Sequence, residues 1–223
     1  MPNRHPQGMR QLTIFARGGA RPGAGRKPKG ERALVTHAVR PALTRHDPVL
    51  VTARLLPGLP NLRRESTLVT LRRALSAGSD RFGLRLVEYS IQTNHLHLIV
   101  EAEDAGSIAR GMQGLLVRIA KALNRAWGRR GKVLADRYHA RILRSPRVVR
   151  AALVYVLQNA RKHGSRLTGI DAFSSGAWFQ GWCDRIAKGP RPIATARSWL
   201  LTIGWRRGGL LRTSETPALS PPG

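Results

Sequence analysis

The sequence predicts an α+β fold of ferredoxin-like (split βαβ) type, in which an antiparallel sheet carries helices on one face. Two observations lead to it. Segments with alternating apolar residues and segments with helical spacing follow one another in the order β-α-β-β-α-β-α, and the first six match that plan. In addition, 42% of the residues are hydrophobic, which is enough to build a buried core. The seventh element is an extra helix after the fourth strand.

The first four elements are read from apolar periodicity. We expect a strand within 48–55 and then a helix over 61–78, where leucines recur every three or four residues. Residues 82–91 alternate apolar and other side chains, and we expect a second strand there that begins at Phe82. A short turn leads to a third strand at 95–101.

The last three elements carry most of the charged and polar motifs. Residues 106–126 place their large apolar side chains on one stripe, which predicts an amphipathic helix. After a glycine-containing turn we expect a fourth strand over 133–143. Pro146 is suited to the first turn of a helix, and the following pattern continues to Gly164.

Composition divides the 223 residues into four parts. Residues 1–45 are predicted to be a flexible basic arm, because glycine and proline interrupt both helix and strand there. Residues 46–165 form the expected folded domain, 166–207 a tryptophan-rich extension, and 208–223 a disordered tail.

Positive charge is the strongest compositional signal. With 39 Lys+Arg against 12 Asp+Glu the net charge is +27, which predicts a polyanionic partner, best matched by nucleic acid. No apolar run is long enough to span a membrane, there is no signal-peptide pattern, and Cys183 is the only cysteine. We therefore expect a cytoplasmic, nucleoid-associated protein with no membrane partner. The cations expected to contact DNA are Arg110, Arg118, Lys121, Arg125, Arg129, Arg130, Lys132, Arg137 and Arg141, with Arg26, Lys27 and Lys29 in the arm.

His95-Leu-His97 is the first candidate for chemistry. Alternate residues of a strand share a face, so both imidazoles can bind one metal ion while Leu96 turns to the core. Two ordinary histidines on a polar face give the same pattern. Glu101 extends it to His-x-His-x-x-x-Glu, as in a cupin metal motif, but the flanking helices argue against an all-β cupin.

Tyr155-Val-Leu-Gln-Asn159 is the second candidate. Residues four apart on a helix lie on one face, so the hydroxyl of Tyr155 and the amide of Asn159 would point into one space, and His163 extends the row. A tyrosine on a helix is more often a partly buried core residue than a nucleophile. The order of the two motifs, with a basic helix and a strand between them, gives the pair its specificity. We expect this basic helix and the strand after it to flank the site.

On these residues the chain resembles the single-tyrosine HUH transposases, and among them the branch of REP-associated tyrosine transposases. Asn94-His-Leu-His-Leu-Ile-Val100 is similar to that family's histidine segment, and Tyr155 and Asn159 fall on its Tyr-x-x-x-Asn helix motif. The resemblance covers about residues 46–165. Many relatives have proline after the asparagine, where this chain has Ala160.

The resemblance implies a site and a reaction. His95, His97 and Asn159 would bind Mg²⁺ or Mn²⁺, and Tyr155 would attack a phosphate of single-stranded DNA to form a 5′-phosphotyrosine. Imidazole ligands suit Mn²⁺ better than Mg²⁺. The expected partner is single-stranded or hairpin DNA, and the protein acts as a monomer or a homodimer. His163 and Glu101 are candidate bases.

Two other functions stay open at this point. One is a DNA-binding regulator of the same fold that no longer cleaves. The other is a module that binds single-stranded RNA, although no Gly-Phe-x-Phe run of the usual kind is present on the strands. Trp178 and Trp182 could stack on unpaired bases, but packing of the extension onto the core is the favoured interpretation.

Overall fold

The structure, a computed structural model, describes residues 43–162, 169–184 and 189–217. Five strands form one sheet in the order β2-β3-β4-β1-β5, and all neighbouring strands are antiparallel. The elements are β1 (Val49–Arg54), α1 (Glu65–Ala77), β2 (Asp80–Arg81), β3 (Leu84–Ile91), β4 (His95–Ala102), α2 (Ala105–Ala126), β5 (His139–Ile142), α3 (Pro146–Leu157), α4 (Asn159–Lys162), η1 (Ser175–Trp178), α5 (Trp199–Thr202) and η2 (Gly204–Gly208). Leaving aside the two-residue β2, this is the split βαβ order, so the predicted fold class is confirmed.

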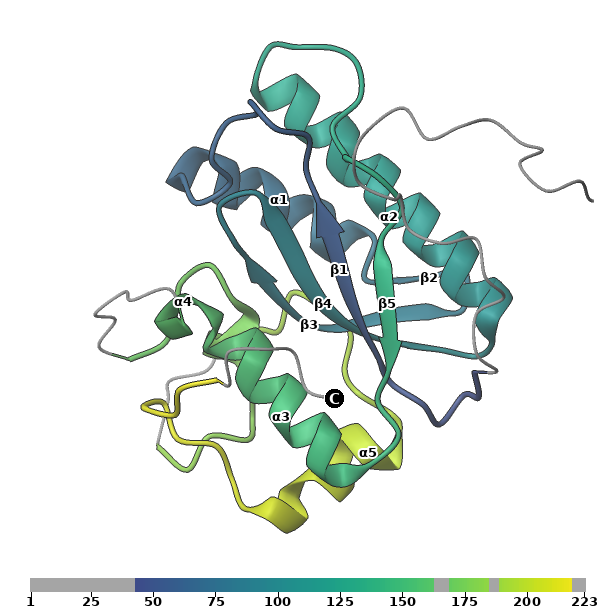
Figure 1. Cartoon of the computed structure of the whole chain (residues 1–223), viewed down its shortest axis with the longest axis vertical. Coiled ribbons are helices and arrows are strands. Elements are labelled where there is room, and N and C mark those ends of the chain that lie inside the picture. Colours follow the sequence, from purple (N-terminus) through teal and green to yellow (C-terminus); the bar gives the residue numbers. More distant parts are fainter. Residues whose placement is uncertain (1–42, 163–168, 185–188, 218–223) are drawn as a thin grey trace, which may run out of the picture. The chain divides into compact units, whose positions relative to one another are not determined.

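Helices α1 and α2 cover one face of the sheet (Figure 1). Leu96, Leu98 and Val100 of β4 point to this face and join the apolar stripe of α2 in one buried cluster. Asp104 caps α2, because its side chain accepts a hydrogen bond from the backbone N–H of Ser107. The apolar residues at alternating strand positions and at helical spacing therefore meet in a single core.

The opposite face of the sheet is covered by α3 and by C-terminal residues. Ile99 of β4 packs there with most of α3, with Trp182 and with the almost fully buried Trp205. The sheet thus lies between two layers, with α1 and α2 on one side and α3 and α5 on the other (Figure 1). The extension predicted for 166–207 contributes to this second core.

Two strand boundaries differ from the prediction. The strand expected to begin at Phe82 begins at Leu84, because Phe82 and Gly83 both have positive φ angles (57° and 73°) and form the turn between β2 and β3. The strand expected over 133–143 is reduced to β5 and an isolated bridge at Leu134. Between them Tyr138 turns into the core beneath α1 and α2, which takes the backbone out of register with β1.

The disordered tail predicted from residue 208 is also wrong for residues 208–217. Leu211 is fully buried and exchanges backbone hydrogen bonds with Gly181 and Cys183. Arg150 of α3 forms an ion pair with Glu215. The reason is long-range packing onto α3, which local composition does not reveal.

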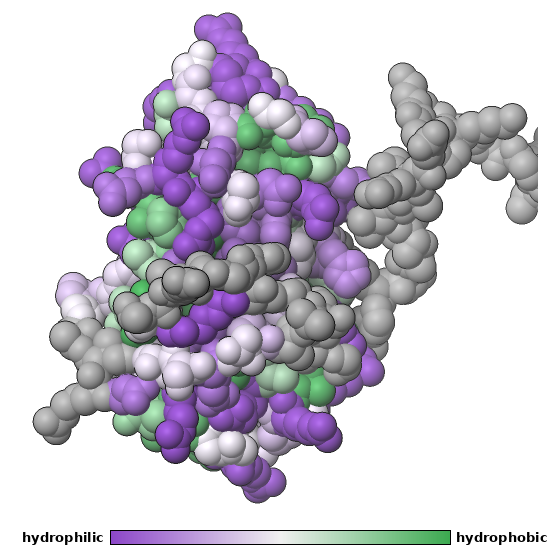
Figure 2. Space-filling view, turned by 60° about the vertical axis from the view of Figure 1, so that its left-hand side comes forward, coloured by the Kyte–Doolittle hydropathy of each residue, from purple (hydrophilic) through white to green (hydrophobic). Residues whose placement is uncertain are grey.

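Most of the predicted basic arm, including Arg26, Lys27 and Lys29, lies outside the described residues, as does His163. No helix in the described ranges has both the length and the apolar character needed to cross a bilayer. The surface in Figure 2 is mostly hydrophilic, with small separated apolar areas.

Candidate active site

The two histidines of the motif lie at the start of β4, on the face toward α3. Their neighbours Leu96 and Leu98 are buried on the other face, as the alternation predicts. In the strand register His97 is opposite Thr52 of β1 on one side and Ser90 of β3 on the other. His95 is opposite Arg54. Directly opposed residues share a face, so these side chains surround the histidine pair.

The ring nitrogens of the two histidines converge. The Nε2 atoms of His95 and His97 are 3.0 Å apart. The Nδ1 atom of His95 is 2.8 Å from the Oδ1 atom of Asn94, and the Nδ1 atom of His97 is 3.0 Å from the hydroxyl of Thr52. Partners of this kind on one ring nitrogen orient the other nitrogen as a ligand. Both Nε2 atoms therefore face one point.

Tyr155 reaches this point from α3, the helix that covers this face of the sheet. Ser145 caps α3 by accepting a hydrogen bond from the N–H of Val148, and Pro146 occupies the first turn. Two and a half turns later the hydroxyl of Tyr155 lies 3.4 Å from the Nε2 atom of His97. The two rings meet edge to face, with centroids 4.9 Å apart. The two motifs, 58 residues apart, thus form one cluster.

Asn159 follows just after α3 and begins α4. Its side chain is 1% exposed, and neither its Nδ2 nor its Oδ1 atom has a hydrogen-bond partner within the described residues. Leaving a buried amide unpartnered costs about 1–3 kcal/mol. The amide is thus the kind of buried group whose partner would be a bound ligand.

The spacing of the two histidine nitrogens fits a divalent ion. Two nitrogens bound at a right angle to one ion, each at about 2.1 Å, lie about 3 Å apart, close to the separation of the two Nε2 atoms. The buried Oδ1 atom of Asn159 is a suitable oxygen donor. No cluster of three His, Cys, Asp or Glu residues capable of holding a metal occurs in the ranges that the structure describes. The site would therefore need asparagine, substrate and water oxygens.

Glu101 is on the same face as the histidines but has another role. Arg85 binds it in an ion pair, and the backbone N–H groups of Arg197 and Ser198 donate to its carboxylate. With its oxygens engaged by these donors, Glu101 anchors C-terminal residues to the sheet. It is a poor candidate for the base that the sequence suggested.

The basic helix was expected to flank the tyrosine, and this expectation is wrong. Its apolar stripe packs on the sheet face that carries Leu96 and Leu98, so Arg118, Lys121 and Arg125 lie on the far side of the sheet from Tyr155. The helix is basic on its solvent side, which sequence periodicity gives correctly, but periodicity does not say which face of the sheet a helix covers.

The other predicted DNA-contacting cations are divided between several places. Arg129 and Lys132 donate hydrogen bonds within the turn after α2, and Arg110 donates to Ser107. Arg130 and Arg137 are exposed. Arg141 of β5 is opposite Leu50, which packs against α3, so Arg141 faces the tyrosine side.

Sequence reasoning missed Thr52 and Arg54. Thr52 lies between His97 and His139 in the register, and Arg54 is exposed beside His95. The signal that could have found them is strand pairing: β1 and β4 are adjacent in a split βαβ sheet, so residues of β1 must lie next to the motif. Of the tryptophans, Trp182 is buried beside Phe179, and Arg72 lies over the ring of the partly buried Trp178.

Comparison with known proteins gives one informative result. No family model matches the chain, and no curated protein is similar to it in sequence. Among solved structures, it is similar to a REP-associated tyrosine transposase bound to a REP hairpin, with a TM-score of 0.50 and 16% identity, over 63% of this chain and 82% of the other. What the two share is the fold. At this identity the likeness concerns the arrangement of sheet and helices.

Proposed function

We propose that the protein is a metal-dependent enzyme that nicks and rejoins single-stranded DNA, in the manner of a transposase, through a 5′-phosphotyrosine intermediate. The observation that carries the proposal is the convergence of the Tyr155 hydroxyl and two histidine Nε2 atoms within hydrogen-bonding distances. The fold of a protein bound to a DNA hairpin and the net charge of +27 also support it.

In the proposed step the Oη atom of Tyr155 attacks the phosphorus in line with the 3′-oxygen. A phosphorus–oxygen bond to tyrosine forms, the bond to the 3′-oxygen breaks, and the proton lost by the phenol is balanced by the proton that the new 3′-hydroxyl gains. A 3′-hydroxyl attacking the phosphotyrosine reverses these changes. The covalent bond keeps the energy of the phosphodiester, so rejoining needs no nucleotide cofactor.

The protein's residues position this reaction. His95, His97 and Asn159 would hold a divalent ion, Mg²⁺ or Mn²⁺, which would polarise a phosphate oxygen and offset charge in the transition state. Asn94 and Thr52 hold the two imidazole rings with both Nε2 atoms turned inward. Tyr155 and His97 are buried whereas His95 is partly exposed, so substrate would approach from the side of His95. Holding the nucleophile next to the bound phosphate accelerates attack.

The test is covalent trapping. The protein is incubated with hairpin DNA that has single-stranded flanks and a label at its 3′ end, which is the end that stays on the tyrosine, with Mn²⁺ or Mg²⁺, and run on a denaturing gel. We expect an adduct that EDTA and Tyr155→Phe both abolish. Tyr89→Phe is the matched control, because it removes the same hydroxyl from a buried tyrosine on the other sheet face.

An adduct that persists in Tyr155→Phe would exclude this nucleophile. Binding without an adduct over a range of hairpins and both metals would favour a DNA-binding protein that does not cleave.

A further inference from the structure

A groove between α1 and α2 remains without a role in the proposed reaction. It has a volume of about 580 Å³ and lies on the sheet face opposite Tyr155. Four cations line it, Arg73 from α1 and Arg118, Lys121 and Arg125 from α2, and no acidic residue does. Its other lining residues are Thr70, Ala74, Ala77, Gly114, Val117, Ala122 and Ala126. We call this surface the α1/α2 groove.

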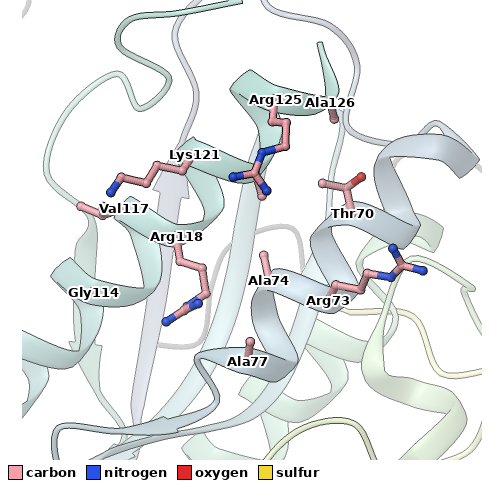
Figure 3. A pocket seen from close by; sticks show the side chains of 11 residues that line it. Thr70, Arg73, Ala74, Ala77, Gly114, Val117, Arg118, Lys121, Arg125 and Ala126 are labelled. Carbon is pink, nitrogen blue, oxygen red and sulfur yellow. The ribbon is translucent and has the colours of Figure 1, made fainter. Parts of the chain in front are cut away.

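The cations of the groove are not used by the fold. Within the described residues none of the four takes part in an ion pair or a side-chain hydrogen bond. Figure 3 shows Arg118 and Arg125 extending from α2 toward the small residues Ala74 and Ala77 of α1. A groove lined by four positive charges and by no acidic residue attracts an anionic ligand.

The spacing of the cations fits a sugar–phosphate backbone. Arg118, Lys121 and Arg125 follow one another along one side of α2, and seven residues of helix span about 10 Å. A strand of duplex DNA carries one phosphate per about 3.4 Å of helix axis, so this length matches about three phosphates. Sites for single strands add aromatic platforms on which bases stack, and no aromatic residue lines the groove. The lining therefore suits paired DNA, whose bases are hidden.

Phe82 stands at one end of this groove. Its ring packs beside Gly114, where a Cβ would come within 3.1 Å of it, yet the side chain remains 59% exposed. Its φ of 57° places a bulky residue in the left-handed region, which is unfavourable for any side chain except Asn or Asp. A two-residue turn of this kind favours Asn-Gly. An exposed aromatic ring held at an unfavourable backbone angle is thus poorly explained by folding alone.

We infer that the α1/α2 groove binds the backbone of a paired DNA stem, and that Phe82 stacks on the first unpaired base beyond the end of that stem. The inference rests on the proposed function only in taking DNA as the ligand. The stem would be held on one face of the sheet while the strand to be cut reaches Tyr155 on the other. Binding of the stem and cleavage of the single strand would then depend on different residues and could be altered independently.

The first experiment measures binding of a labelled hairpin with an unpaired flank, in EDTA so that no cleavage occurs. The variant is Arg118→Ser/Lys121→Ser/Arg125→Ser. Losing three phosphate contacts should reduce the slope of log affinity against log salt by about 2.7, so that raising salt from 50 to 200 mM weakens the wild type about 40-fold more than the variant. Arg206→Ser/Arg207→Ser/Arg212→Ser is the control, because it removes equal charge from exposed residues elsewhere.

Equal salt slopes for the groove variant and the control would overturn the inference, because the loss would then reflect net charge alone. A short single-stranded oligonucleotide with Mn²⁺ is the second probe. The groove variant should form the Tyr155 adduct with it as the wild type does. The wild type could form no adduct while the groove variant still binds the hairpin more weakly. That result would contradict the proposed reaction but would support DNA binding by the α1/α2 groove.

The second experiment replaces Phe82 by Asn. The change should stabilise the turn, because Asn-Gly suits its backbone angles, and yet weaken binding of the flanked hairpin about 5- to 150-fold, the loss expected for one stacked base. A blunt-ended duplex without unpaired bases should bind with a smaller loss. Higher thermal stability together with unchanged hairpin affinity would remove Phe82 from the proposed surface.

Discussion

The two faces of the sheet are built in different ways, although β1, β3 and β4 contribute to both. The face beneath α1 and α2 is filled by aliphatic side chains such as Leu98. The face toward α3 buries charged and polar groups among its apolar residues, and Glu88, Glu101 and His97 each have polar partners there. Since a buried polar group is costly unless it is hydrogen-bonded, the polar contacts of this face must be specific. One face mainly holds the fold together, and the other fixes groups in place.

The largest expected effect is on stability, and it distinguishes the two faces through Leu98 and His97, which are adjacent residues of β4. Leu98→Ala should lower the free energy of unfolding by about 2–5 kcal/mol, because it leaves a cavity in a fully buried site. His97→Ala should cost only about 1–2 kcal/mol, the loss of its hydrogen bonds, but should abolish the covalent adduct. Urea unfolding and the trapping assay measure both. Equal losses in the free energy of unfolding for the two changes would mean that both faces of the sheet contribute equally to the stability of the fold.

The next effect concerns the charged contact that ties the C-terminal residues to the sheet. Arg191 binds the carboxylate of Glu88 and also donates to the backbone carbonyls of Val87 and Trp178. Arg191→Met would leave a buried carboxylate unpaired. We expect a loss of about 2–3 kcal/mol in urea unfolding, less than for a fully buried pair because the Arg191 side chain is 19% exposed. Glu88→Gln leaves no buried carboxylate charge, and the charge it leaves on Arg191 is 19% exposed, so this change should cost less.

Glu88 also predicts whether the stability of the fold rises or falls with pH. Burial raises the pKa of its carboxyl above the ordinary value of 4.5, and Arg191 and Ser175 only partly oppose this. A carboxyl with a raised folded pKa stabilises the fold below its unfolded pKa, and this contribution is lost as pH rises through the folded pKa. Relative to Glu88→Gln, the wild type should therefore be more stable at pH 4.5 than at pH 7. The opposite trend would show that Arg191 outweighs burial.

The sequence predicted the face of the sheet beneath α1 and α2 much better than the polar face toward α3. Apolar spacing located α1, α2, β3 and β4, because each has to bury a stripe or a face on the same core. The His-x-His pattern also predicted the orientation of His95 and His97, since alternation in a strand is a local property.

The polar face depends on contacts between residues far apart in the chain. Glu101 meets the backbone of Ser198, 97 residues away, and Arg63 pairs with Asp171, 108 residues away. No local pattern signals such partners. The sequence likewise placed α2 beside the tyrosine, whereas its stripe of apolar residues is satisfied on the opposite side of the sheet.

A smaller effect tests whether Thr52 positions His97 for metal binding. Thr52→Val keeps the shape of the side chain but removes the hydroxyl 3.0 Å from the Nδ1 atom of His97. Loss of such a partner weakens metal binding about 10- to 100-fold. Thr52→Ser keeps the hydroxyl and should restore the affinity. The readout is Mn²⁺ titration followed by electron paramagnetic resonance, and equal affinities of Thr52→Val and the wild type would assign Thr52 to packing alone.

The smallest expected effect returns to the difference between the faces, through two exposed arginines. Arg54 is opposite His95 in the register on the tyrosine side, whereas Arg125 lines the groove on the other side. If Arg54 contacts a phosphate next to the scissile one, Arg54→Ala should weaken binding of a short single-stranded oligonucleotide a few-fold and lower its salt slope by about 0.7. Arg125→Ala should leave the binding of this oligonucleotide unchanged, because a strand too short to form a stem has no reason to occupy the groove. Equal losses of affinity from both changes would mean that single strands are attracted by the charge of the whole protein. The functional difference between the two faces would then be limited to the histidines and the tyrosine.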